Sequence, residues 1–158
     1  MTPGGAGTTV RLRRTTRESR IDLALTLRTT GANAHHVAED SALALGVALR
    51  RALPARGLQR FGEATVAMDE SLVQVVIDLV DRPYYASDLP PDTLGEHLLR
   101  SLVLEGRFTF HQRSVRPGEI HHLLEATYKA FGLALGRAIR PAERELSLKG
   151  EVTWTVDP

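Results

Sequence analysis

Two stretches of this chain are copies of each other. Residues 35–39 (HHVAE) recur as residues 121–125 (HHLLE), an offset of 86 positions (121 − 35). Five further positions match at this offset: Gly46 with Gly132, Ala48 with Ala134, Leu49 with Leu135, Arg51 with Arg137 and Ala52 with Ala138. Repeated sequence indicates repeated supersecondary units that bury their apolar faces together. The chain is therefore expected to be a tandem duplication, with four of its six histidines in equivalent places.

The repeated motif has the residue types of a metal site. Positions three apart on a helix share a face, so His36 with Glu39 and His122 with Glu125 are each expected to hold one ion. The first histidine of each copy points about 100° away and would reach a different ion. A single copy is more simply explained as a capped or solvated helix start, and it is the duplication that favours metal. Imidazole and carboxylate together suit Mn, Fe or Zn without selecting one.

Composition narrows the class of protein. The chain of 158 residues fits one domain, and the lack of cysteine excludes disulfides and thiolate metal ligands. A net charge of +1 argues against bulk binding of nucleic acid. Residues 1–10 are expected to form a flexible tail and not a signal peptide, and no apolar run is long enough for a membrane span. Cytoplasmic residence is the simplest expectation.

Hydrophobic periodicity predicts a mixed α/β protein with two layers (α+β). Strands are expected at residues 20–28, 61–67, 72–79, 107–115 and within 146–156, and helices at 35–53, 93–104 and 121–139. Each half then follows the order strand, turn, histidine helix, strand. Residues 11–158 are expected to form one domain of two pseudo-repeats, about 11–88 and 89–158, joined at Pro90-Pro91 and related by a pseudo-twofold axis. The helix at 93–104 has no counterpart in the first half, and its His97 is expected to be a partly exposed structural residue.

A series of motifs then resembles one known family, the imidazoleglycerol-phosphate dehydratases. The matching stretches lie in family order and cover almost the whole chain: 14–19 (RTTRES), 35–40 (HHVAED), 58–62 (LQRFG), 68–70 (MDE), 78–83 (DLVDRP), 108–111 (FTFH), 121–131 (HHLLEATYKAF) and 147–150 (SLKG). The resemblance implies a duplicated α/β unit, assembly into a homo-oligomer of 24 chains, and active sites between subunits that each hold two manganese ions.

Site residues follow from the same resemblance, position by position. The implied metal ligands are His35, His36, Glu39, His111, His121, His122 and Glu125. Glu18 and Lys129 fall on catalytic positions, and Arg60, Arg82, Ser147 and Lys149 fall on positions that bind substrate or its phosphate. Only two lysines occur among the 20 basic residues of the chain, and both are in this set. From composition alone, chance explains the retention of these two lysines as well as a functional role does.

The implied reaction is the dehydration of imidazole glycerol phosphate to imidazole acetol phosphate, a step of histidine biosynthesis. A metal bound to the substrate's imidazole would act as a Lewis acid. Glu18 would move protons as a general acid or base, while the cationic side chains hold the phosphate dianion.

The first half departs from the family pattern. The family has a helix carrying Asp-His-Met between its N-terminal motif and the first histidine helix. Here only 16 residues separate Glu18 from His35 (35 − 18 − 1), and that motif is absent. The first half is thus shortened, and five histidines are left for two ions. Three readings stay open: an active metal-dependent dehydratase, an impaired relative that binds metal and phosphate ligand without turnover, and an assembly protein in which metal joins subunits.

Overall fold

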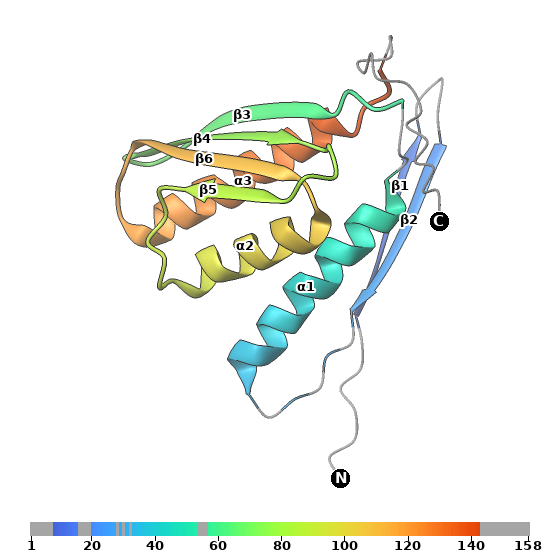
Figure 1. Cartoon of the computed structure of the whole chain (residues 1–158), viewed down its shortest axis with the longest axis horizontal. Helices are drawn as coiled ribbons and strands as arrows, with labels where there is room; N and C mark the ends of the chain where they lie inside the picture. Colours follow the sequence, from blue (N-terminus) through green and yellow to red (C-terminus); the bar gives the residue numbers. More distant parts are fainter. Residues whose placement is uncertain are drawn as a thin grey trace, which may run out of the picture.

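The computed structural model describes residues 8–15, 20–27, 29, 31, 33–53 and 57–142. Figure 1 shows the arrangement of its elements. In chain order these are β1 (Thr8–Thr15), β2 (Arg20–Leu27), α1 (Ala34–Ala52), β3 (Phe61–Met68), β4 (Ser71–Asp78), β5 (Tyr84–Ser87), α2 (Leu94–Gly106), β6 (Thr109–Arg116) and α3 (Ile120–Ala138). The fold is mixed α/β, as the periodicity predicted.

The larger sheet has four strands in the order β3-β4-β6-β5. Strand β4 pairs antiparallel with both β3 and β6, while β5 runs parallel to β6. The parallel pair is possible because α2 provides the long crossover that such a pair requires. A separate antiparallel hairpin of β1 and β2 lies at the right of Figure 1.

The core lies between one face of this sheet and helices α2 and α3 (Figure 1). Strand β4 alternates, so Val73, Val75 and Ile77 point into the core, and Phe110 of β6 joins them. Opposite them, α3 presents four fully buried alanines: Ala126, Ala130, Ala134 and Ala138. Small side chains at this spacing let the helix approach the sheet closely. The other face of the sheet carries no helix among the described residues.

Two glycines mark the closest approaches. A Cβ at Gly62 of β3 would overlap the backbone carbonyl of Ala134 in α3. A Cβ at Gly46 of α1 would meet backbone atoms of Leu102 and Gly106 in α2. These contacts set α3 against the sheet and α1 against α2, and so fix where the N-termini of the helices lie.

Several expectations about boundaries need correction. Strand β1 begins at Thr8, so residues 8–10 belong to a strand, and placing them in a flexible tail was wrong. Strand β5 was not anticipated, because it has four residues and follows Pro83. Pro90-Pro91 lies in the connection from strand β5 to helix α2, and β3, β4 and β5 share one sheet with β6. The strand expected within 146–156 lies outside the described residues.

The connection before α1 is short. Only residues 28–33 separate the end of β2 from the start of α1. The helix that packs along α1 is α2, which lies in the second of the two expected pseudo-repeats. Within the described part of the chain, no helix is long and apolar enough to cross a membrane.

Candidate metal centre

The first histidine motif begins α1. Asn33 is the N-cap, and its side-chain oxygen accepts hydrogen bonds from the backbone N–H groups of His35 (2.9 Å) and His36 (3.4 Å). Asparagine is a favoured N-cap because it satisfies helix N–H groups that lack a partner within the helix. Both histidines are therefore held in the exposed first turn, one turn before Glu39.

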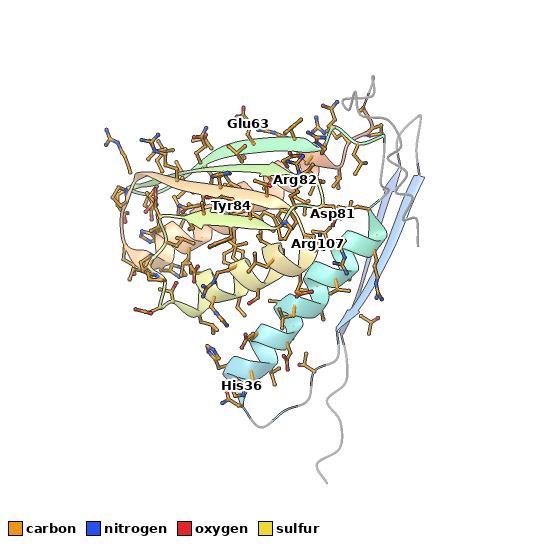
Figure 2. The ribbon with its side chains drawn as sticks, viewed as in Figure 1. His36, Glu63, Asp81, Arg82, Tyr84 and Arg107 are labelled. Carbon is orange, nitrogen blue, oxygen red and sulfur yellow. The ribbon has the colours of Figure 1, made fainter. Side chains whose placement is uncertain are left out.

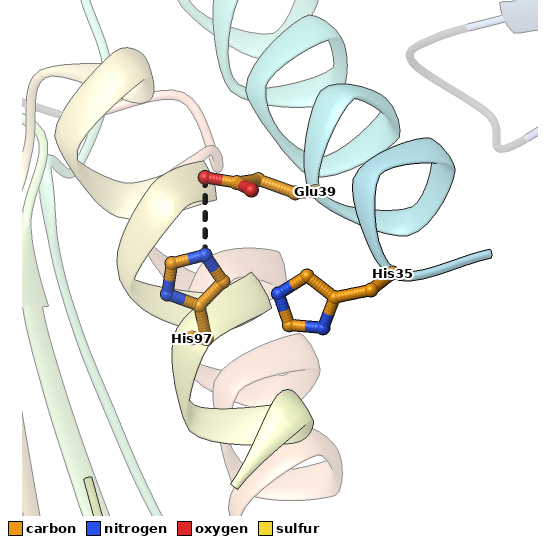
Figure 3. Close-up of side chains that lie close together, drawn as sticks. All are labelled: His35, Glu39 and His97. Atoms are coloured by element: carbon orange, nitrogen blue, oxygen red, sulfur yellow. Dashed lines mark ion pairs between the residues drawn. The ribbon is translucent and has the colours of Figure 1, made fainter. Parts of the chain in front are cut away.

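A group of three potential ligands forms where α1 meets α2. His35, Glu39 and His97 each offer one ligand atom, and these atoms all lie within 4.8 Å of one another. His97 Nε2 is 3.0 Å from Glu39 Oε1, and the rings of His97 and His35 stack with centroids 5.6 Å apart. Figure 3 shows the three side chains converging from the two helices.

This grouping differs from the pairing expected from the sequence. Glu39 lies with His35, four residues before it, and not with His36. Around a helix, positions four apart are separated by about 40° and positions three apart by about 60°, so the i, i+4 pair is closer in angle. The ring of His36 instead forms an edge contact with the ring of His35, at 6.1 Å between centroids.

A second group forms where α3 meets the turn between β3 and β4. Asp69, Glu70 and His122 have ligand atoms within 4.8 Å of one another. Asp69 and Glu70 form a two-residue turn in which Asp69 has φ 48°, a conformation that Asp adopts more readily than most residues. His122 Nδ1 is 3.0 Å from Glu70 Oε2, and His122 Nε2 is 3.4 Å from Asp69 Oδ2.

Hydrogen bonds shift the pKa values of two residues in the second group. The backbone N–H of Glu119, the N-cap of α3, donates to Glu70 Oε1 at 2.6 Å. This bond, with a further backbone bond and one to His122, lowers the pKa of Glu70 to about 2. The hydrogen bond to Glu70 raises the pKa of His122 in return. Glu70 is thus an ionised carboxylate at the positive end of a helix, where negative charge is favoured.

The other residues of the second motif are His121, next to His122, and Glu125, one helical turn later. His121 Nε2 is 3.4 Å from Glu125 Oε2, again an i, i+4 pair, and His121 is 73% exposed. Lys129 Nζ is 2.6 Å from Glu125 Oε1, and the hydrogen bond from Lys129 lowers the pKa of Glu125. Lys129 Nζ also lies 3.7 Å from the sulfur of Met68. An ammonium, a carboxylate and an imidazole therefore follow one another along one exposed face of α3.

His111 lies elsewhere. It is on β6 and opposite Val76 of β4, on the sheet face that carries no described helix. Its ring lies 5.2 Å from that of Tyr84. Within one chain the structure does not group His111 with either His–carboxylate cluster.

The two described arginines of the predicted site are near the end of β4. Arg60 has φ 64°, and its Nε is 2.7 Å from Asp78 Oδ1. Burial raises the pKa of Asp78, an effect that the positive charges of Arg60 and Arg82 oppose. Figure 2 shows Arg82 at this end of the sheet and His36 at the N-terminus of α1, well apart in the molecule. One chain therefore does not bring Arg82 to its first histidine motif.

Three predicted site residues, Glu18, Ser147 and Lys149, lie outside the described residues. Conversely, sequence reasoning did not select His97, Asp69 or Glu70 as site residues. The segment MDE at 68–70 did carry a signal, since two adjacent carboxylates between two strands fall in an exposed turn. His97 had no local signal, because its partners are on a helix about 60 residues earlier.

The donor sets suit a divalent transition metal. Both groups offer imidazole nitrogen and carboxylate oxygen, the ligands that Mn, Fe and Zn accept. The residues of each group come from two elements whose packing is fixed, so the ligand atoms are gathered before an ion binds. Either group could bind and orient a ligand through a metal ion, and Lys129 adds a group able to donate a proton.

Comparison with known proteins gives a consistent result. The sequence model of the family described as Imidazoleglycerol-phosphate dehydratase matches residues 10–135. The imidazoleglycerol-phosphate dehydratase of a Nocardioides species is 38% identical over 144 residues, which span 78% of this chain and 71% of the relative. That of Solidesulfovibrio magneticus is 46% identical over 128 residues, 74% of this chain and 65% of the relative. The chain thus spans about two thirds of the length of these relatives.

Solved structures of two imidazoleglycerol-phosphate dehydratases are also similar to this chain. The crystal structure of the Staphylococcus aureus imidazoleglycerol-phosphate dehydratase is similar with a TM-score of 0.63 and 31% identity, covering 72% of each chain. The Pyrococcus furiosus structure gives a TM-score of 0.69 and 32% identity, covering 84% of this chain and 78% of that one.

Proposed function

Because the chain belongs to the imidazoleglycerol-phosphate dehydratase family, whose members are hydro-lyases, we propose that it catalyses the metal-dependent dehydration of imidazole glycerol phosphate to imidazole acetol phosphate. One observation carries the metal dependence: the two histidine helices start at groups of imidazole and carboxylate donors, each compact enough for one ion. The step belongs to histidine biosynthesis, and a cytoplasmic enzyme is the simplest proposal for a soluble biosynthetic family.

The cofactor is proposed to be Mn²⁺, two ions per active site. When bound, such an ion supplies Lewis acidity to the ring nitrogen of the substrate. The proposed ligands are His35, His36, Glu39, His111, His121, His122 and Glu125. This set includes residues that lie apart in one chain, which is consistent with sites that draw ligands from two subunits.

The protein groups have separate tasks in this proposal. Arg60 and Arg82, with Ser147 and Lys149, bind the phosphate and fix the orientation of the substrate. Glu18 removes or returns a proton at the reacting carbons. Lys129 is an exposed ammonium beside Glu125 and would donate a proton to the departing hydroxyl.

A homo-oligomer, with 24 chains by analogy with the family, is part of the same proposal. The sheet face without a described helix carries exposed apolar side chains: Phe61 (52%), Val76 (38%), Tyr84 (53%) and Val115 (48%). Exposed apolar side chains on an uncovered sheet face are consistent with contact with another subunit. His111 lies on that face, so assembly there would bring a candidate ligand to an interface.

The second candidate function is an impaired relative that binds metal and phosphate ligand without turnover. The short connection between β2 and α1 favours it, because the helix of the family's Asp-His-Met motif is missing from this connection.

One experiment separates the two functions. The purified protein, stripped of metal and reloaded with Mn²⁺, is assayed for the keto product by ultraviolet absorbance, and substrate binding is measured by calorimetry. Mn²⁺-dependent product formation, abolished by Glu125→Gln but not by Glu105→Gln on α2, supports the dehydratase. Tight Mn²⁺ and substrate binding without product would establish the impaired relative.

A further inference from the structure

Charged side chains are paired unevenly at the end of the sheet where Arg82 lies. Arg60 pairs with Asp78, with 2.7 Å between Nε and Oδ1. Arg107, the residue that follows α2, pairs with Asp81 at 2.6 Å between the same two atom types. Among the described residues, the side chain of Arg82 forms no hydrogen bond or ion pair, and it acts on Asp78 only through its charge.

We infer that Arg107 is a positioning residue for phosphate binding: it engages the carboxylate of Asp81 and so leaves the neighbouring Arg82 available to an anionic substrate. Figure 2 shows the three residues at one end of the sheet. The inference rests on the proposed function, in which Arg82 binds the phosphate of the substrate. It adds Arg107 and Asp81, to which that proposal gives no role.

The guanidinium of Arg107 holds Asp81 at two points. Its Nε donates to the carboxylate at 2.6 Å, and its Nη2 donates to the backbone carbonyl of the same residue at 3.3 Å. The rigid fork of donors on a guanidinium permits such a double contact, whereas the ammonium of a lysine is a single point charge. The carboxylate of Asp81 is therefore directed toward the C-terminal end of α2 and is not engaged by the side chain of Arg82.

Hydrogen bonds with the segment after α2 also fix the backbone around Arg82. The hydroxyl of Thr109 donates to the carbonyl of Arg82 at 3.2 Å, and the N–H of Tyr84 donates to the carbonyl of Phe108 at 3.3 Å. Arg107 directly precedes these two partners in the chain. One short segment thus places the backbone of Arg82 and also neutralises the acidic residue next to it.

Stability does not account for the ion pair. The side chain of Asp81 is 71% exposed and that of Arg107 is 41% exposed, and exposed ion pairs contribute little to stability. Both residues have a left-handed backbone, with φ 53° for Asp81 and 55° for Arg107, which costs free energy for residues other than glycine. The pair does change the surroundings of Arg82, because an unpaired carboxylate there would repel a phosphate dianion and compete for the guanidinium.

The test compares two substitutions that break the same ion pair from opposite sides. Arg107→Gln leaves the carboxylate of Asp81 unpaired, so the affinity for imidazole glycerol phosphate should fall about 3- to 10-fold. Asp81→Asn removes the carboxylate and leaves Arg107 as an additional cation, so the affinity should equal or exceed that of wild type. Asparagine tolerates the left-handed backbone as aspartate does. Calorimetry on the full chain measures both affinities.

The contrast between the two variants separates this role from a purely structural one. If the pair only held the loop, both substitutions would weaken binding alike, so weaker binding by Asp81→Asn would overturn the inference. Unchanged binding by Arg107→Gln would also overturn it. Asp81→Asn decides the matter even if Arg107→Gln does not fold.

A double variant and a control complete the comparison. Asp81→Asn combined with Arg107→Gln should recover the affinity that Arg107→Gln loses, and a double variant as weak as Arg107→Gln would contradict the inference. Arg113→Gln removes an exposed positive charge from β6 and should bind substrate as wild type does. An equal loss in Arg113→Gln would mean that net charge alone explains the effect, and the role of Arg107 would fall.

Ionic strength gives a second readout. Raising salt from about 0.01 M to about 1 M shortens the screening length from about 30 Å to about 3 Å. The ratio of substrate affinities between wild type and Arg107→Gln should therefore approach one at high salt. A ratio that does not change with salt would show that the contribution of Arg107 is not electrostatic.

Failure of the inference is separable from failure of the proposed function. A protein that makes the keto product, but whose substrate affinity does not change in Arg107→Gln, keeps the function and loses this role. A protein that binds substrate without making product, and that shows the contrast between Arg107→Gln and Asp81→Asn, keeps the role and loses the function.

Discussion

Glu70 orients His122 from a different element of the fold. Its carboxylate lies 3.0 Å from His122 Nδ1, while Glu119 N–H holds the same carboxylate from the start of α3. A histidine whose Nδ1 is engaged by a carboxylate offers Nε2 to a metal ion, an arrangement found repeatedly at metal sites. Here Nε2 of His122 lies 3.4 Å from Asp69 Oδ2. The turn between β3 and β4 therefore determines which nitrogen of His122 is available for metal.

Glu70→Gln should weaken metal binding at His122. Glutamine keeps the size of the side chain but removes the charge that orients the imidazole and increases its basicity. Loss of a carboxylate that orients a metal-binding histidine reduces metal affinity about 10- to 100-fold. Calorimetric Mn²⁺ titration of Glu70→Gln measures this loss of affinity. The control is Glu63→Gln, which replaces an exposed carboxylate on β3. Equal affinities for the two variants would show that Glu70 has no part in metal binding.

The same pair predicts how the stability of the metal-free protein depends on pH. The pKa of Glu70 falls from 4.5 to about 2 on folding, so its stabilisation is present above pH 4.5 and is lost as the pH falls toward 2. The pKa of His122 is raised above 6.5, so its stabilisation is present below pH 6.5 and is lost as the pH rises through the raised pKa. The stabilisation from the pair is therefore largest between pH 4.5 and 6.5.

Urea unfolding of the chelated protein tests this dependence. The difference in unfolding free energy between wild type and Glu70→Gln should peak in that window and shrink on both sides. A difference that stays constant with pH would mean that the pair is not coupled to folding.

Close packing of α3 on the sheet predicts opposite effects for two glycines. Alanine at Gly62 would force its Cβ into the carbonyl of Ala134, a backbone atom that cannot move aside cheaply, and should cost about 1–3 kcal/mol of stability. Alanine at Gly132, where nothing lies within 4 Å of the added Cβ, should instead stabilise α3 by about 0.5–1 kcal/mol. Urea unfolding compares the two. A neutral Gly62→Ala would show that β3 and α3 are not packed this closely.

The elements were predictable where local chemistry decides them. The helix predicted at residues 93–104 corresponds to α2 (Leu94–Gly106), and the strand predicted at 72–79 corresponds to β4 (Ser71–Asp78). Strand β5 was not predicted, because a segment of four residues becomes a strand only through pairing with β6. Sequence periodicity records a residue's own helix or strand and says nothing of what packs beside it.

The same limit explains which site residues could be identified from the sequence. The repeat identified His35, Glu39 and their copies, because those residues share one helix turn. It did not identify His97, whose partners depend on how α1 crosses α2. The repeat did not identify Glu70 either, since Glu70 meets His122 only because the turn between β3 and β4 packs against the N-terminus of α3.

Arg60 and Arg82 should respond differently to the same substitution. Arg60 is paired with Asp78, whose pKa burial already raises, so Arg60→Gln leaves a half-buried carboxylate without its cation. That variant should lose both unfolding free energy and affinity for the phosphate substrate. Arg82 is exposed, and its backbone carbonyl is held by the Thr109 hydroxyl at 3.2 Å, so its position does not depend on its own side chain.

Arg82→Gln should therefore keep the stability of wild type while substrate affinity falls about 10- to 100-fold, the loss expected for one charged hydrogen bond. Calorimetry with imidazole glycerol phosphate and urea unfolding measure the two properties separately. Arg113→Gln, an exposed arginine on β6 that is assigned no role in binding, should change neither. If Arg82→Gln binds substrate as tightly as Arg113→Gln does, Arg82 does not contact the phosphate.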